Sequence, residues 1–185
     1  MPKKLFIVIP LVFAMLLTGC FGREKTPESP QDVNLILNNV WDSLSDDEKF
    51  PCYGGDSENM TDGKPGEFSL SDTDGLQYNL LVPQAQVASI EQAASLIHGM
   101  MVNNFTCGAF RLSKEVDADA FAKAMADAYT GNQWICGTPE RYFVASVGKR
   151  CVVACFGLEQ VLDLFRQKLI AAYPETQILY QDAIV

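Results

Sequence analysis

Motifs of common enzyme classes are scarce in this sequence of 185 residues. It contains a single histidine, His98, and it has no C-x-x-C pair, phosphate-binding glycine loop, dinucleotide-binding glycine motif or G-x-S-x-G motif. Because a serine or cysteine nucleophile usually requires a histidine base, a lone histidine without a matching partner pattern disfavours that chemistry. It also disfavours zinc, which is usually held by four ligands in a structural site. The sequence therefore supplies no complete catalytic set, and we expect no cofactor.

One enzyme-like motif, S-x-x-K at residues 146–149, lies in the wrong context. In penicillin-binding enzymes the serine of this motif opens a helix, so the lysine lies beside it one turn on. Here the four residues cross a predicted hairpin turn, which separates the two side chains.

Basic residues are few, with 14 lysines and arginines against 23 acidic residues and a net charge of −9. Removal of residues 1–19, which contain two lysines and no acidic residue, leaves a net charge of −11. Nucleic acids and anionic lipids would repel a chain this acidic. We therefore expect no nucleic-acid partner.

Long hydrophobic runs are missing as well. The apolar stretch Leu5–Leu17 is interrupted by Pro10, and it is shorter than the roughly 20 residues that a helix needs to cross a membrane. Two lysines precede it and small residues follow it. This order predicts a secretory signal peptide over residues 1–19.

The end of this stretch, Leu17-Thr18-Gly19-Cys20, resembles the lipobox of bacterial lipoproteins. The resemblance implies cleavage before Cys20 and diacylation of its thiol, and an ordinary signal peptide or an uncleaved anchor is the alternative. Each buried acyl methylene contributes about 0.8 kcal/mol, so two or more chains give stable anchoring. We expect a lipid anchor in the cell membrane, with the body of the protein on the extracytoplasmic face.

The rest of the chain divides into a linker and one domain. Residues 20–31 carry two prolines and mixed charge, which is typical of a flexible or extended linker. Residues 32–185 have the length of a single domain.

Hydrophobic periodicity predicts most elements of that domain. The order of helices, strands and an antiparallel hairpin predicts an α+β two-layer sandwich, with helices on one face of a mostly antiparallel sheet. Residues 82–97 fit neither pattern clearly. The predicted elements are helices over 32–45, 117–129 and 158–173, strands over 105–112 and 177–180, and a hairpin of 141–147 with 151–156.

Residues 46–76 form an acidic segment rich in glycine, proline and aspartate, and we expect a long loop there with one short helical turn near its end. Asp72-Thr73-Asp74-Gly75 matches the opening of a calcium-binding loop, but the later bidentate glutamate is missing. Asp72 and Asp74 are therefore weak calcium candidates, and a solvated acidic loop is the favoured interpretation.

Five cysteines follow Cys20, namely Cys52, Cys107, Cys136, Cys151 and Cys155. An odd number leaves at least one outside any intramolecular disulfide. Cys151 and Cys155 share one strand face about 13 Å apart, so they cannot bond to each other, but either could face Cys107 on a neighbouring strand. Buried thiols and disulfides are both open, with buried thiols slightly favoured.

The segment Trp134-Ile135-Cys136-Gly137 has a superficial likeness to a thioredoxin active site, but it lacks the second cysteine that this chemistry needs. We expect Trp134 and Cys136 to cap the core between a helix and the hairpin. The loop from Trp134 to Glu140 is the candidate ligand-binding or reactive loop.

The second half of the chain resembles small uncharacterised lipoproteins of Gram-positive, mostly clostridial, bacteria, which carry a C-terminal domain of unknown function after a lipobox. The residues that carry this likeness are Asn104-Phe105-Thr106, Asn132 to Gly137, Pro139-Glu140, Phe156-Gly157 and the helix from Phe165 to Tyr173. It covers roughly residues 85–185 and implies an α+β fold and a cell-surface location, but no reaction or ligand.

The function expected from the sequence is a non-enzymatic, lipid-anchored module that binds another component of the cell envelope. The alternatives are a thiol-dependent enzyme that uses Cys136 and a calcium-binding adhesion module.

Overall fold

The computed structural model describes residues 32–135 and 137–185. The predicted signal peptide, Cys20, the linker up to residue 31 and Cys136 lie outside this part of the chain. In order, the elements are α1 (Val33–Asp42), β1 (Cys52–Gly54), β2 (Thr61–Asp62), β3 (Gly66–Phe68), α2 (Thr73–Tyr78), α3 (Gln84–Val87), β4 (Ile90–His98), the 3-10 helix η1 (Val102–Asn104), β5 (Phe105–Leu112), α4 (Ala118–Gly131), β6 (Arg141–Val147), β7 (Cys151–Gly157), α5 (Glu159–Ala172) and β8 (Gln177–Ala183).

All the strands belong to one antiparallel sheet. The strand order is β2-β1-β4-β5-β7-β6-β8, and β3 pairs with β4 beside β1. The predicted hairpin is β6 and β7, which turn through Gly148 at a φ of 66°. The α+β class and the mostly antiparallel sheet predicted from the sequence are therefore confirmed.

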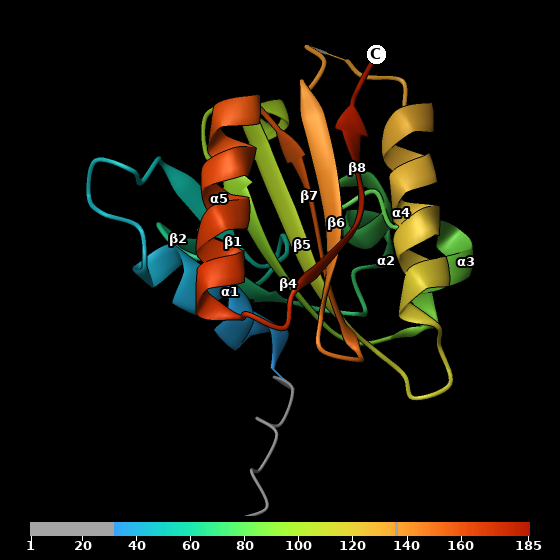
Figure 1. The fold of residues 1–185 in the computed structure, drawn as a ribbon. Coiled ribbons are helices and arrows are strands. Elements are labelled where there is room, and N and C mark those ends of the chain that lie inside the picture. The colour runs from blue at the N-terminus through green and yellow to red at the C-terminus, as the bar shows by residue number, and fades with distance from the viewer. Residues whose placement is uncertain (1–31, 136) are drawn as a thin grey trace, which may run out of the picture.

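Helices cover both faces of the sheet. One buried cluster joins α1 and α5 to one face, and a second cluster joins α2 and α4 to the other. Figure 1 shows α1 and α5 on one side of the strands and α2, α3 and α4 on the opposite side. The molecule thus has three layers, whereas the sequence predicted two layers with helices on one face.

The physical reason for the third layer lies in the central strands. Every residue of β7 is buried, and so is every residue of β5 except Arg111. Side chains alternate between the two faces of a strand, so such a strand places apolar groups on both faces and both need a cover. A count of helices along the sequence does not reveal how they divide between the faces.

Two of the long helices, α1 and α4, begin at a capping aspartate. Asp32 accepts hydrogen bonds from the backbone N–H groups of Asn34 and Leu35 at the start of α1, and Asp117 caps α4 through the N–H of Asp119. Aspartate at this position satisfies backbone donors that have no partner within the helix. The predicted helices over 32–45, 117–129 and 158–173 are confirmed, with ends that differ by a few residues.

Residues 46–76, predicted as a long loop, contain the three short strands β1, β2 and β3 as well as the start of α2. Asp56 organises this segment, because its buried carboxylate accepts hydrogen bonds from the N–H groups of Glu58, Asn59 and Ser69. The ambiguous residues 82–97 form the short α3 and most of β4.

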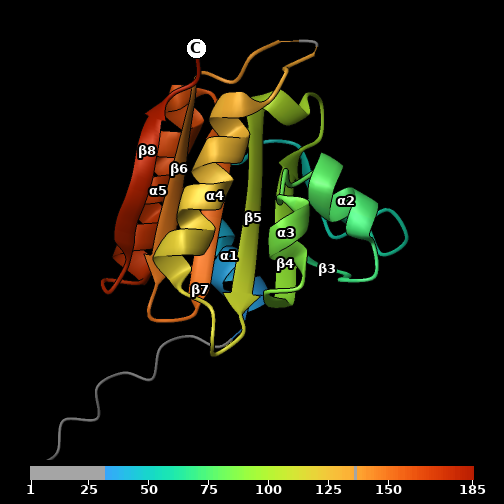
Figure 2. The same ribbon diagram turned by 90° about the vertical axis from the view of Figure 1, so that its right-hand side faces the viewer.

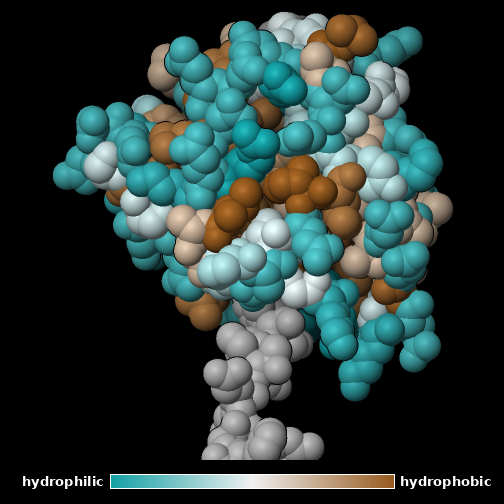
Figure 3. Space-filling view, viewed as in Figure 1, coloured by the Kyte–Doolittle hydropathy of each residue, from teal (hydrophilic) through white to brown (hydrophobic). Residues whose placement is uncertain are grey.

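The face that carries α5 and β8 is mainly hydrophilic, with a band of hydrophobic groups across its middle (Figure 3). The polar residues Glu159, Gln160 and Gln167 of α5 are exposed to solvent. Among residues 32–135 and 137–185, no helix combines the length and the apolar character needed to cross a membrane.

Candidate functional site

A pocket of about 240 Å³ lies at one end of the sheet, where β4 and β7 end. The segment after α4 and the end of α2 form its other walls. Figure 2 shows that α2 and α4 lie over the same face of the sheet, with β5 visible between them. We call this cavity the Trp134 pocket.

Three kinds of side chain line the Trp134 pocket, and none of them is charged at neutral pH. The aromatic group consists of Tyr53, Tyr78, Trp134 and Phe156. The carboxamide group consists of Asn79, Asn103, Asn132 and Gln133, and the aliphatic group consists of Leu81, Ile97, Val102 and Ile135. Apolar walls with a few convergent polar groups are typical of small-molecule sites.

Trp134 forms one wall by packing on the sheet. Its ring contacts Phe156 edge to face, with centroids 4.9 Å apart and an angle of 60° between the planes. The indole Nε1 is buried and has no hydrogen-bond partner in the described part of the chain. A buried donor of this kind costs about 1–3 kcal/mol when it is left unsatisfied, so it is suited to donate to an acceptor that enters the pocket.

Asn103 holds the wall in place. Its side-chain Nδ2 donates to the carbonyl oxygens of Ile135 and Gly137, at 3.2 and 2.5 Å. These bonds tie η1 to the segment after α4, although the two are about 30 residues apart in the chain. The position of Trp134 therefore depends on a contact between the two segments.

Leu81 also lines the pocket, and its backbone is strained. Its φ of 55° makes it the one residue other than glycine with a positive φ among those that the structure describes. Such a conformation costs a residue with a Cβ roughly 1–2 kcal/mol, and strained residues often cluster at binding sites.

The rim of the pocket is unusually apolar. The side chains of Tyr78 and Ile135 are 79% and 80% exposed, and Val102 is 49% exposed. Met100 and Met101, directly before Val102 in the chain, are exposed as well. Contiguous exposed apolar groups beside a cavity favour a binding site over an ordinary surface.

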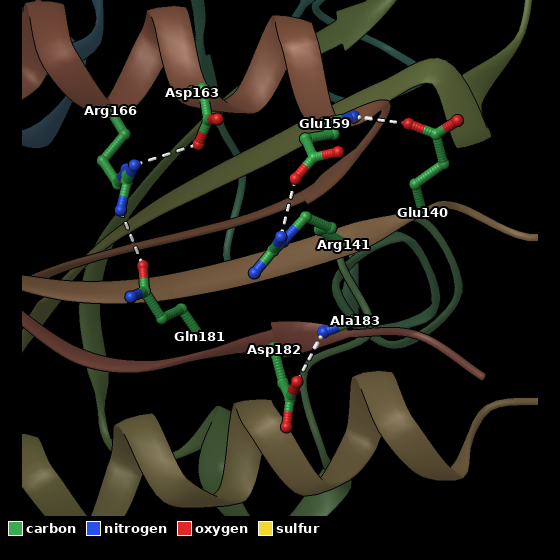
Figure 4. A network of polar contacts seen from close by, with 8 residues as sticks. All are labelled: Glu140, Arg141, Glu159, Asp163, Arg166, Gln181, Asp182 and Ala183. Atoms are coloured by element: carbon green, nitrogen blue, oxygen red, sulfur yellow. Dashed lines mark hydrogen bonds and ion pairs between the residues drawn. The ribbon is translucent and has the colours of Figure 1, made fainter.

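The structure separates the residues of the predicted Trp134–Glu140 loop. Trp134 lines the pocket, whereas Glu140 is not among the lining residues. One carboxylate oxygen of Glu140 accepts from the backbone N–H of Glu159 at 2.8 Å, and it thereby caps α5 (Figure 4). Cys136 lies outside the described residues, so the thiol-enzyme alternative stays a prediction.

A second, polar cavity lies between α5 and the neighbouring strands β6 and β8, and two arginines, Arg141 and Arg166, are among its lining residues. Arg141 contacts Glu159 at 2.6 Å, and Arg166 contacts Asp163 at 3.0 Å and the side-chain oxygen of Gln181 at 2.8 Å (Figure 4). Both guanidinium groups are therefore already neutralised by carboxylates. The network fastens α5 to β6 and β8, and it does not favour an anion site.

The calcium candidates serve structural roles or face solvent. Asp72 caps α2 by accepting from the N–H of Gly75 at 2.8 Å, and Asp74 is an exposed residue in the first turn of that helix. Within residues 32–135 and 137–185, no cluster of three or more histidine, cysteine, aspartate or glutamate side chains is placed to hold a metal ion.

The four cysteines that the structure describes, Cys52, Cys107, Cys151 and Cys155, are buried thiols. Burial raises the pKa of Cys52 and of Cys151 to about 11. A thiolate is the nucleophilic form of cysteine, so these groups are poorly suited to covalent catalysis at neutral pH.

Sequence reasoning identified Trp134 but missed most of the pocket. Asn132 and Gln133 adjoin Trp134 in the chain, and an aromatic residue next to two carboxamides was the available indication. Tyr53, Tyr78 and Asn103 come from distant segments, and no local pattern marks them. Comparison of the chain with protein-family models, with curated proteins and with solved structures finds no match in any of the three.

Proposed function

We propose that this protein is a lipid-anchored binding module of the cell envelope, and that the Trp134 pocket holds its ligand. The lipobox-like residues Leu17 to Cys20 support the anchor, because they follow a signal-peptide pattern directly. The acidic composition supports a body that stands off an anionic membrane surface.

The chemistry of the pocket narrows the ligand to a small neutral molecule with one apolar face and several hydroxyl or amide groups, such as a saccharide. The flat faces of Trp134 and Tyr78 suit the apolar face of a sugar ring. Each carboxamide offers both donors and an acceptor, which matches hydroxyl groups that both donate and accept. A charged ligand would find no counter-ion among the lining residues.

The observation that carries the proposal is the buried, unpartnered Nε1 of Trp134 between aromatic and carboxamide walls. A ligand oxygen would accept a hydrogen bond from this Nε1–H group. Without a ligand, the buried donor has no acceptor and its free-energy cost remains. The proposal needs no catalytic group, in agreement with the binding function expected from the sequence.

Fluorescence titration tests the proposal, because the chain has only two tryptophans. Trp41 is a residue of α1, is buried in the core that α1 and α5 cover, and does not line the pocket, so a Trp41→Phe variant leaves Trp134 as the sole reporter. We expect neutral mono- and oligosaccharides, including N-acetylated amino sugars, to change its emission saturably. The ligand class would be wrong if none of these saccharides changed the emission saturably at concentrations up to ~10 mM. This limit corresponds to a binding free energy weaker than about 3 kcal/mol.

Two pocket variants test the site itself. Trp134→Ala should weaken binding at least about tenfold in calorimetry, which is typical for loss of a central aromatic contact. Asn132→Asp keeps the shape of the side chain but adds a negative charge, and it should also weaken binding. Gln160→Glu is the matched control on exposed α5; if it weakened binding as much as Asn132→Asp, the site would be misassigned.

A further inference from the structure

Cys107 on β5 and Cys155 on β7 face each other across the centre of the sheet. They are direct register partners, and both side chains are fully buried. Their Sγ atoms are 2.8 Å apart. Both belong to the core that α1 and α5 cover, so the two side chains point to the same side of the sheet.

The register places this pair where a disulfide is easiest to form. The N–H of Leu112 donates to the carbonyl of Arg150, and the N–H of Leu158 donates to the carbonyl of Asn104. These bonds mark the pairs Leu112–Arg150 and Asn104–Leu158 as hydrogen-bonded, and hydrogen-bonded pairs alternate with non-hydrogen-bonded pairs along an antiparallel ladder.

Cys107 is an odd number of residues from both Asn104 and Leu112, so Cys107 and Cys155 form a non-hydrogen-bonded pair. Cα atoms of such pairs are about 4.5 Å apart, and their side chains are closer than in the other kind of pair. A disulfide accepts Cα separations of about 4.4–6.8 Å. The two thiols can therefore join without moving either strand.

We propose that Cys107 and Cys155 form an intramolecular disulfide between β5 and β7 in the exported protein. Of the other two cysteines that the structure describes, neither is placed to compete: Cys151 is opposite Arg111 rather than Cys107, and Cys52 lies on β1, with β4 between it and β5. The inference does not depend on the ligand of the Trp134 pocket, but it rests on export, since disulfides persist mainly outside the cytosol.

The oxidant is the disulfide of a separate protein of the thiol–disulfide oxidoreductase class. One cysteine thiolate attacks a sulfur of this disulfide and releases one oxidant thiol, and a mixed disulfide forms. The other cysteine of the protein, after losing its proton, then attacks the mixed disulfide and releases the second oxidant thiol. Two protein thiols are oxidised to one disulfide, and the oxidant disulfide is reduced to two thiols.

Oxidation has to precede final folding. Burial raises the pKa of Cys155 well above its usual value, and the strand environment leaves an enzyme no access to either sulfur. The crosslink joins positions 48 residues apart and encloses α4 and the β6–β7 turn. Once formed, it ties together the two strands at the middle of the sheet order.

Thiol counting by mass spectrometry tests the proposal. The full protein is taken from the membrane fraction, its free thiols are trapped by alkylation in denaturant without reductant, and it is digested. We expect alkylation of Cys52, Cys136 and Cys151 only, together with a crosslinked peptide pair that contains Cys107 and Cys155. Alkylation of all five cysteines, or a crosslink between other partners, would overturn the proposal.

A second measurement separates the crosslink from folding defects. Reductant should lower the melting temperature of the wild-type protein by several degrees, and it should leave a Cys107→Ala/Cys155→Ala double variant unchanged. Cys151→Ala is the matched control, because it removes a buried thiol of β7 and should keep the response to reductant. An equal response in the double variant would contradict the assignment.

Discussion

At the residue scale, the buried carboxylate of Asp56 holds together a segment that has little regular secondary structure. Its oxygens accept from three backbone N–H groups and from the side-chain amide of Asn59. Burial by itself would raise the pKa of Asp56, but the hydrogen bonds from Ser69, Glu58 and Asn59 outweigh it and lower the pKa. The carboxylate is therefore a structural anion rather than a calcium ligand.

Asp56→Asn should lower the free energy of unfolding by about 1–3 kcal/mol at pH 7, because the amide replaces an ionised acceptor with a group that also donates. The difference from wild type should shrink as the pH falls below about 3.9, the usual pKa of aspartate in an unfolded chain. A lowered folded-state pKa contributes stability above that pH, and the contribution is lost as the carboxylate protonates. Urea unfolding at pH 7 and at pH 3 measures both effects.

Asp74→Asn is the control for this comparison. Asp74 is exposed, so its change should alter stability by less than about 0.5 kcal/mol. A loss in Asp74→Asn as large as that in Asp56→Asn would show that net charge, and not the hydrogen bonds of Asp56, sets the effect.

At the element scale, Gly54 and Gly66 allow the short strands β1 and β3 to pack closely against each other. A Cβ on Gly54 of β1 would lie within 2.1 Å of the backbone nitrogen of Gly66 on β3 and within 2.6 Å of the backbone oxygen of Ser95 on β4. These neighbours are backbone atoms, which cannot turn away as a flexible side chain can. Gly54 therefore lets β1 and β3 pack together along β4.

Gly54→Ala should destabilise the protein and loosen β1 and β3 first. Over-packing of this kind typically costs about 1–3 kcal/mol, and faster amide exchange across residues 52–68 than in the rest of the sheet would locate it. Gly131→Ala at the end of α4 is the control, because a Cβ there meets no atom within 4 Å and alanine favours a helix. Equal losses in the two variants would contradict this account.

Predictability differed sharply between elements. The strand predicted over 105–112 is β5 with the same bounds, and the hairpin and the three long helices were also predicted. β1, β2 and β3 escaped prediction because strands of two or three residues are too short to show a period. The small residues of β4, such as Ala93 and Ala94, fit a helix as well as a strand.

The proposed lipid anchor belongs to the scale of the whole molecule, because it would decide where the domain acts. Cys20→Ala should accumulate an uncleaved precursor without acyl mass, since both processing and acylation are expected to require the Cys20 thiol. Mass spectrometry of the intact protein measures both changes. Membrane association is not a sufficient test, because an uncleaved apolar segment can also hold the chain at a membrane.

Cys52→Ala is the control for this experiment. Cys52 belongs to the buried core, so its loss should leave cleavage and acylation intact. A Cys20→Ala protein that is cut and lipidated normally would contradict the anchor.

The sequence by itself determined the α+β class, the long helices, the β6–β7 hairpin and the expectation of a lipid anchor. These features depend on periodicity and motifs among neighbouring residues, which are visible along the chain. The tertiary structure alone decided that helices cover both faces, that Cys155 rather than Cys151 faces Cys107, and that Tyr53, Tyr78 and Asn103 join Trp134 in one pocket. The physical reason is that strand register and side-chain packing depend on contacts between segments far apart in the chain, which no local pattern encodes.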